Sequence, residues 1–367
     1  MCTLFIIVAL SSGLNAEILG SGQWGFQIDP PEEFEFVGGD QIKSFEFESP
    51  DGIGLTLMIY TNVQTVDATA ADIQRRLNNQ GQSSFFNYQG KRTAIFNLRF
   101  QNFSGWGLCV PLDPPDGTTA LLLVLAYGDA RRTDLEPVYL SILDSVVPTP
   151  ADRLAPGPVT AWNYPQTRRV SKPLFGTKWG ALVYDNDERA AQAVVDREHA
   201  VMLRYLDSPE WQRAWTRFYR MIYRDSFERL SSIAFIVERT FYQPDGNSRG
   251  AAERVLNWVQ TFRYERDPQG SDFVNVVTAA LEGRGDCDSR ALLWAIILEH
   301  QGIPAAIMVS RSYSHAMGLV DVPGEGARFP LNDKHMLVAE PISQTAIGRI
   351  DRAMSDQKAW LGISFEN

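Results

Sequence analysis

Apolar positions over the first 150 residues alternate or run together in the way that strands require. The runs at residues 45–48 and 55–60 flank a Ser-Pro-Asp-Gly turn, which predicts a hairpin. Further strands are expected at residues 92–100, 106–111 and 120–127. Apolar residues at helical spacing predict a short helix at residues 70–77 and a longer helix at residues 134–147. Residues 17–150 are therefore expected to form an N-terminal α/β domain.

The pattern changes at a proline-rich stretch that follows this domain. Pro148, Pro150, Pro156 and Pro158 favour extended conformations, which predicts a linker. Helices are expected beyond it at residues 187–206, 209–223 and 225–240. Residues 151–245 are therefore expected to be a linker followed by a helical segment.

The expected helix at residues 209–223 carries two interleaved patterns. Its aromatic residues fall mostly three or four positions apart, which predicts packing in a core: Trp211, Trp215, Phe218, Tyr219 and Tyr223. Four basic residues lie between and beside them: Arg213, Arg217, Arg220 and Arg224. Because the chain as a whole is acidic, we expect a solvated, salt-bridged face here and not a nucleic-acid site.

The last third of the chain contains a predicted helix that is apolar on every face. Residues 291–298 are all apolar, and a helix with this pattern must be buried. Gly302 and Pro304 mark its end. Strands are expected after it at residues 305–310, 313–322 and 335–340, and an amphipathic helix before it at residues 249–263. Residues 246–367 are therefore expected to form an α+β domain in which a central helix packs on an antiparallel sheet.

Composition and charge narrow the class of protein. A hydrophobic share of 44% and a charged share of 21% are typical of a folded chain, and 367 residues favour two domains. The formal net charge of −10 argues against nucleic acid or an anionic membrane surface as partner. We find no zinc-spaced cysteine–histidine cluster and no glycine-rich phosphate loop, so no metal or cofactor is expected.

The N-terminal residues have the character of a secretory signal peptide. Residues 4–10 are apolar but too few to span a bilayer, and small or polar residues follow as far as Ala16. This predicts a signal peptide at residues 1–16 and a periplasmic or secreted protein. The run lacks a preceding Lys or Arg, and a buried N-terminal strand is the alternative. Without Cys2, two cysteines remain, too few for a disulfide framework.

Cys287 is the main candidate for chemistry, because it precedes the all-apolar helix directly. Gly283 and Gly285 allow a sharp turn into the helix, whose N-terminus stabilises negative charge. Asp286 and Asp288 oppose thiolate formation, but we expect the helix and a nearby histidine to prevail and lower the thiol pKa. The alternative is a buried structural thiol, which is the role we expect for Cys109.

His315 and Glu340 complete a possible thiol triad, in the chain order cysteine, histidine, carboxylate. His315 lies in an expected strand, and Glu340 ends another one. A histidine satisfied within the core and an exposed strand end are the plain alternatives for these two residues. Asp321 is the rival carboxylate, although it lies on the same expected strand as His315.

These residues carry a family resemblance. Gly285-Asp286-Cys287, the apolar helix ending in Gly-Ile-Pro-Ala, Ser314-His315-Ala316 and Ala339-Glu340-Pro341 resemble the transglutaminase-like superfamily, over roughly residues 245–350. The resemblance implies a papain-like thiol core with Cys287 as nucleophile, His315 as general base and then acid, and Glu340 as the group that orients the imidazole. Two positions depart from the family pattern: Met317 stands where tryptophan is frequent, and Glu340 where aspartate is frequent.

The resemblance implies an enzyme that cleaves a peptide or isopeptide amide through a thioester, with a peptide or protein as substrate. Asn275 and Tyr264 are candidates for the second donor to the oxyanion. One alternative is a protein-glutamine acyl transferase, in which an amine replaces water. Another is a catalytically inactive scaffold that binds peptide.

A second, more general resemblance concerns the N-terminal domain. The order of its expected elements, with Trp24-Gly25-Phe26 near the start and Leu143-Asp144-Ser145-Val146 at the end, resembles the PsbP-like α/β/α sandwich. This implies a binding domain that recruits a protein partner; a structural cap is the alternative. The expected fold class is thus α+β, with an N-terminal sandwich, a helical segment and a transglutaminase-like domain.

Overall fold

A computed structural model describes residues 18–61, 65–175, 180–244, 246–265 and 271–365. The chain forms two compact units: the first contains Met1–Pro165 and Arg197–Met221, and the second contains Gln166–Asp196 and Ile222–Asn367. Helices and sheets occur in both units, so the fold is α+β as expected. The signal peptide expected at residues 1–16 lies outside the described residues. The domain boundaries expected at residues 150 and 245 stay predictions.

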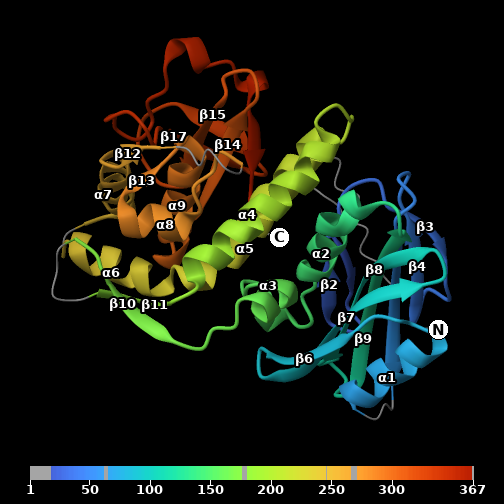
Figure 1. Cartoon of the computed structure of the whole chain (residues 1–367). Coiled ribbons are helices and arrows are strands. Elements are labelled where there is room, and N and C mark those ends of the chain that lie inside the picture. Colours follow the sequence, from blue (N-terminus) through green and yellow to red (C-terminus); the bar gives the residue numbers. More distant parts are fainter. Residues whose placement is uncertain (1–17, 62–64, 176–179, 245, 266–270, 366–367) are drawn as a thin grey trace. The chain divides into compact units, whose positions relative to one another are not determined.

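The first unit is built on a seven-stranded antiparallel sheet with the order β3–β4–β5–β9–β8–β7–β6 (Figure 1). Its strands are β3 (Glu35–Gly38), β4 (Ser44–Glu48), β5 (Gly54–Thr61), β6 (Ser83–Tyr88), β7 (Lys91–Phe100), β8 (Phe103–Leu112) and β9 (Ala120–Asp129). The expected hairpin is confirmed as β4 and β5, with Glu48 opposite Gly54. A separate pair, β1 (Leu19–Ser21) and β2 (Phe26–Ile28), precedes the sheet.

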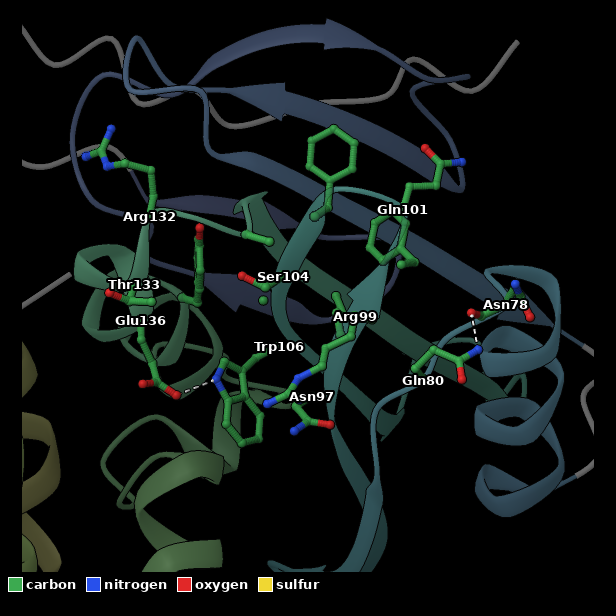
Figure 2. A pocket seen from close by; sticks show the side chains of 16 residues that line it. Asn78, Gln80, Asn97, Arg99, Gln101, Ser104, Trp106, Arg132, Thr133 and Glu136 are labelled. Carbon is green, nitrogen blue, oxygen red and sulfur yellow. Dashed lines mark hydrogen bonds between the residues drawn. The ribbon is translucent and has the colours of Figure 1, made fainter.

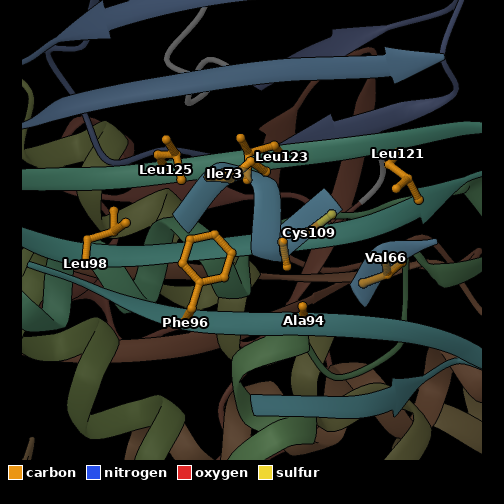
Figure 3. Close-up of a cluster of buried hydrophobic side chains, with 10 residues drawn as sticks. Val66, Ile73, Ala94, Phe96, Leu98, Cys109, Leu121, Leu123 and Leu125 are labelled. Atoms are coloured by element: carbon orange, nitrogen blue, oxygen red, sulfur yellow. The ribbon is translucent and has the colours of Figure 1, made fainter. Parts of the chain in front are cut away.

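One face of this sheet packs against helix α1 (Val66–Arg76). Val66, Ala70 and Ile73 of the helix lie in a buried cluster with strand side chains that include Phe96 and Cys109 (Figure 3). Cys109 is fully buried on β8 and fills the core as a small apolar residue, as expected. The helix begins four residues before the expected position because the Thr65 side chain accepts a hydrogen bond from Ala68 and caps it.

Helices α2 (Glu136–Asp144) and α3 (Pro158–Asn163) also belong to the first unit, and α2 packs on β8 and β9. The expectation of an extended linker from residue 148 onward is wrong. A 3-10 turn (Pro150–Asp152) and α3 occupy this stretch, because proline is favourable at the first position of a helix. The Asp144 carboxylate accepts hydrogen bonds from the backbone and hydroxyl of Thr160, which fixes α3 on α2.

Helices α4 (Asp187–Met202) and α5 (Trp211–Arg229) contribute residues to both units. The expected solvated face of α5 is wrong for Arg217, which is 2% exposed. Its guanidinium donates to Glu198 Oε2 at 2.7 Å and to Ser141 Oγ at 2.8 Å, both within the first unit. The salt-bridged character was expected, but this ion pair is buried.

The second unit contains a five-stranded antiparallel sheet with the order β16–β17–β15–β14–β18. Its strands are β14 (Ala305–Ser310), β15 (His315–Val320), β16 (Arg328–Leu331), β17 (Lys334–Ala339) and β18 (Leu361–Ile363). Helix α9 (Cys287–His300) packs on β14 and β15, and α6 (Ser231–Phe241), α7 (Ser248–Gln260) and α8 (Val276–Glu282) pack against α9. The expected central helix on an antiparallel sheet is therefore present.

The second unit also contains two small strand pairs. One is the hairpin of β10 (Arg169–Pro173) and β11 (Gly180–Tyr184), and the other is the short pair of β12 (Arg263–Tyr264) and β13 (Arg284–Gly285). Trp294 of α9 is fully buried, as the all-apolar pattern required. Across the described residues, we find no helix with the length and apolar character needed to cross a membrane.

Candidate active site

Helix α9 begins at Cys287, and the residues before it fix the direction of its first turn. The Asp286 carboxylate caps the helix by accepting hydrogen bonds from the backbone N–H of Ser289 at 2.9 Å and from its hydroxyl at 2.6 Å. Gly285 has a φ of 153°, and a Cβ there would lie 2.8 Å from the Ser289 Cβ. The glycine is therefore required for the turn that presents the thiol.

A buried arginine within α9 holds this turn in place. Arg290 is 1% exposed; its Nε donates to the Gly285 carbonyl at 3.0 Å and its Nη2 to the Phe262 carbonyl at 2.7 Å. Sequence reasoning missed this role. The available signal was a charged residue directly before an otherwise apolar run, since a buried guanidinium must find acceptors.

His315 and Glu340 are brought together by the pairing of β15 with β17. The His315 Nε2 lies 2.8 Å from the Glu340 Oε2, and the second carboxylate oxygen accepts the backbone N–H of Ile342 at 2.8 Å. In the neutral tautomer whose Nε2–H donates to Glu340, the Nδ1 of His315 carries no proton and can accept one. Asp321, the rival carboxylate, instead lies 3.7 Å from Lys334.

The Cys287 thiol lies against the strand position next to His315. The backbone N–H of Ala316 donates a hydrogen bond to the Cys287 sulfur, and α9 packs directly on β15. Cys287 is 3% exposed, and its sulfur lies 3.4 Å from the Asp288 Oδ2. The structure thus gathers Cys287, His315 and Glu340 around the start of α9 and the edge of β15.

The expected lowering of the Cys287 pKa is wrong in direction. Burial raises this pKa most, and the carboxylates of Asp288 and Asp286 raise it further; the Ala316 N–H opposes them. Asp286 also caps the helix, so its negative charge lies where the helix would otherwise stabilise a thiolate. The resting thiol is therefore protonated, and a base must remove its proton during reaction.

Gln260 of α7 fixes the segment that follows Glu340. Its side-chain Nε2 donates to the Glu340 carbonyl at 2.8 Å and to the Thr345 carbonyl at 3.0 Å. Gln260 is buried, and both bonds hold the backbone on which the carboxylate depends. No sequence signal marked this residue, because a single glutamine at the end of an amphipathic helix is ordinary.

The two candidates for a second oxyanion donor have different surroundings. Asn275 caps α8, and its amide donates to Gln192 and Thr278 at 3.1 and 3.0 Å, so its donors are already used. Tyr264 is half exposed, and its ring lies near the guanidinium of Arg290. Within the described ranges, no group of three or more histidine, cysteine or carboxylate side chains could hold a metal ion.

Two solved structures show a weak similarity to the chain. One is a protein from Bacteroides thetaiotaomicron that is 8% identical; the match covers 55% of this chain and 75% of that protein, with a TM-score of 0.22. The other is a candidate protease from Parabacteroides distasonis that is 10% identical; the match covers 83% of this chain and 68% of that protein, with a TM-score of 0.24. Likeness at this level bears on neither fold nor function. No curated protein matches the chain.

A protein-family model gives the informative match. The model of the transglutaminase-like superfamily matches residues 237–338, which include Cys287 and His315 and end two residues before Glu340. The matched stretch holds α9, the strands β14 to β16 and all but the last residue of β17. The resemblance of residues 17–150 to PsbP-like domains stays a prediction. The C-terminal part of the chain contains a domain of the transglutaminase-like superfamily.

Proposed function

We propose that this domain is a thiol hydrolase that cleaves a peptide or isopeptide amide through Cys287, His315 and Glu340. The observation that carries the proposal is the 2.8 Å contact of His315 Nε2 with Glu340, with the Cys287 sulfur on the N–H of the next residue, Ala316. Membership of the transglutaminase-like superfamily supports an enzyme of hydrolase or peptidase kind.

The first half of the reaction forms a thioester. The Nδ1 of His315 removes the Cys287 proton as the sulfur attacks the substrate carbonyl carbon, and Glu340 stabilises the imidazolium that results. Backbone N–H groups at the start of α9 have no acceptor within the helix and can donate to the oxyanion. The intermediate then expels the amine, which takes the proton from the imidazolium, and an acyl thioester with Cys287 remains.

The second half releases the acid. His315 takes a proton from water as the water oxygen attacks the thioester carbonyl, and it returns that proton to the departing sulfur. The raised pKa of Cys287 fits this order, because a thiol that is protonated at rest depends on the base in the attack step. An amine that replaces water gives an amide, which is the acyl-transfer reaction.

A peptide library made by digesting cellular proteins tests the proposal on many candidate substrates at once. We expect the wild-type chain to generate new amino groups in this library, and Cys287→Ala and His315→Ala to generate none. Cys109→Ala is the matched control and should retain activity, since Cys109 lies in the core of the first unit.

A repeat of the experiment with a fluorescent primary amine distinguishes hydrolysis from acyl transfer. Label in the acyl products indicates acyl transfer, and unlabelled acids indicate hydrolysis. Neither product from the wild type would favour the scaffold.

We also propose that the protein acts outside the cytoplasm, on the basis of the apolar run at residues 4–10 and the small residues that follow. Expression in a bacterial host followed by N-terminal sequencing tests this. A mature chain that starts near residue 17 supports export, and an unprocessed cytoplasmic chain contradicts it.

A further inference from the structure

We propose that the first unit binds an oligosaccharide in a hollow where β7 and β8 meet the start of α2 (Figure 2). The hollow has a volume of about 520 Å³ and is formed by residues of the first unit alone. This inference is independent of the thiol chemistry, which depends on residues of the second unit.

A tryptophan with a fixed orientation forms part of the wall. The indole N–H of Trp106 donates to Glu136 Oε1 at 3.1 Å, and its ring packs against Trp162 with centroids 5.7 Å apart. Figure 2 shows Trp106 between Glu136 and the side chains of Asn97 and Arg99. An aromatic ring has an electron-rich face that attracts polarised C–H groups. The C–H face of a sugar ring fits such a surface.

Amide side chains supply most of the polar groups around this ring. Asn78, Gln80, Asn97 and Gln101 all line the hollow. A carboxamide both donates and accepts hydrogen bonds, as a hydroxyl does, so a cluster of amides suits a ligand with many hydroxyls. Asn97 is oriented for this, because its Oδ1 accepts the Gln82 N–H at 2.6 Å and its amino group is left to donate.

The charges in the hollow argue against a metal ion, because arginines outnumber carboxylates among the lining residues. Glu136 is the one carboxylate among the lining residues, and it is bonded to Trp106. Arg132 is held by two 2.9 Å bonds to Asp134. Arg99 forms no ion pair with any part of the chain that the structure describes, so its guanidinium remains to donate to neighbouring hydroxyls or to a single sugar carboxylate.

Native electrophoresis of the full chain through gels that contain soluble polysaccharide tests the proposal. The panel holds neutral polymers (arabinoxylan, mixed-linkage β-glucan, galactomannan) and acidic ones (polygalacturonate, alginate). We expect at least one polymer to retard the wild type, and Arg99→Ala and Trp106→Ala each to weaken the interaction by about tenfold. Arg92→Ala is the matched control, because Arg92 is on the same strand, carries the same charge and pairs with Asp67 outside the hollow.

Each result has a defined meaning. Retardation that is lost in Arg99→Ala and Trp106→Ala and kept in Arg92→Ala and in Cys287→Ala supports the site. The polymer that acts shows whether the ligand is neutral or acidic. If Trp106→Ala fails to fold, Arg99→Ala decides, since it removes no described side-chain hydrogen bond. No retardation of the wild type in any gel overturns the proposal. Equal loss in Arg92→Ala also overturns it, because net charge would then explain the binding.

Discussion

At the scale of single residues, Cys287 shows how burial and neighbouring charges together set the pKa of one thiol. Burial and two flanking carboxylates raise the thiol pKa, while the Ala316 N–H lowers it. A thiol in these surroundings does not form a stable thiolate at neutral pH, so its reactivity depends on His315 as base. This differs from the lowered thiol pKa that the sequence alone led us to expect.

The first prediction concerns Asp288. Asp288→Asn removes a negative charge near the sulfur and should lower the Cys287 pKa. A fall of one pKa unit gives about three times faster alkylation by iodoacetamide at pH 7.5, since the tenfold gain in thiolate is partly offset by lower nucleophilicity. Asp333→Asn, the same charge change at an exposed turn, is the control. An unchanged or slower rate in Asp288→Asn would count against this account of the thiol.

The second prediction separates the two candidate carboxylates. Glu340→Ala leaves the His315 Nε2–H without its acceptor, and we expect turnover of a substrate found in the library to fall by about a hundredfold or more. Asp321→Ala removes only a contact with Lys334 at the surface and should keep nearly full activity. Steady-state kinetics of the two variants decide the assignment; a greater loss in Asp321→Ala would reverse it.

The sequence pointed to the three residues of the proposed triad, which stay a prediction, but not to the groups that hold them. The glycine-rich turn before an all-apolar helix pointed to Cys287, and strand patterns pointed to His315 and Glu340. Gln260 could not be predicted, because its role depends on α7 lying next to the segment after β17, a contact that spans 80 residues. The direction of the Cys287 pKa shift was also missed, since sequence does not reveal how deeply the sulfur is buried.

At the scale of elements, the contact between α9 and β15 is the one on which the candidate site depends. Gly318 lies on β15 beside Trp294, and a Cβ at Gly318 would lie 2.4 Å from the Trp294 ring. The ring cannot easily move, because its N–H donates to the Ala252 carbonyl at 3.0 Å. The close approach of helix and strand therefore requires a glycine.

We predict that Gly318→Ala forces α9 away from β15. Overpacking of this kind costs about 1–3 kcal/mol, so amides of β14 and β15 should exchange hydrogen about 5 to 150 times faster than in the wild type. Alkylation of Cys287 should also lose its dependence on His315. Gly22→Ala is the control, since nothing lies within 4 Å of the added Cβ. Wild-type exchange in Gly318→Ala would contradict the packing.

Elements with a strong pattern were predicted well, and weakly patterned ones were missed. Strand β14 lies at the predicted residues, because it is buried on both faces and bounded by a proline and a turn. The edge strands β3, β6, β16 and β18 were not predicted, because each is either short or largely unburied. The break between α5 and α6 falls at Leu230, later than expected, because apolar spacing alone does not mark where one helix ends.

At the scale of the whole molecule, buried charges make the stability of the first unit depend on pH. Glu32 is 3% exposed, one carboxylate oxygen has no partner within the described chain, and burial raises its pKa from 4.5 to about 7. The folded state thus binds the proton more tightly than the unfolded state between these pH values. This contribution to stability is present below pH 4.5 and is lost as the pH rises to about 7.

We predict that Glu32→Gln removes this dependence. At pH 5 the variant and the wild type should unfold at similar urea concentrations, because Glu32 is then largely neutral. At pH 8 the variant should be more stable by up to about 3 kcal/mol. Urea midpoints at both pH values measure the difference, with the exposed Glu35→Gln as control. A difference that does not change with pH would mean that Glu32 is charged in the fold throughout this range.

The most direct test of the central claim compares the two cysteines of the folded chain. Mass spectrometry can follow iodoacetamide labelling of Cys287 and Cys109 at pH 7.5 in the wild type and in His315→Ala. Cys109 is fully buried in a cluster of apolar side chains, so this residue serves as an internal unreactive thiol. We predict that Cys287 reacts faster than Cys109 and slows by about tenfold or more in His315→Ala, while Cys109 is unchanged. Equal and slow labelling of both cysteines, with the same rates in the wild type and in His315→Ala, would contradict a catalytic role for Cys287.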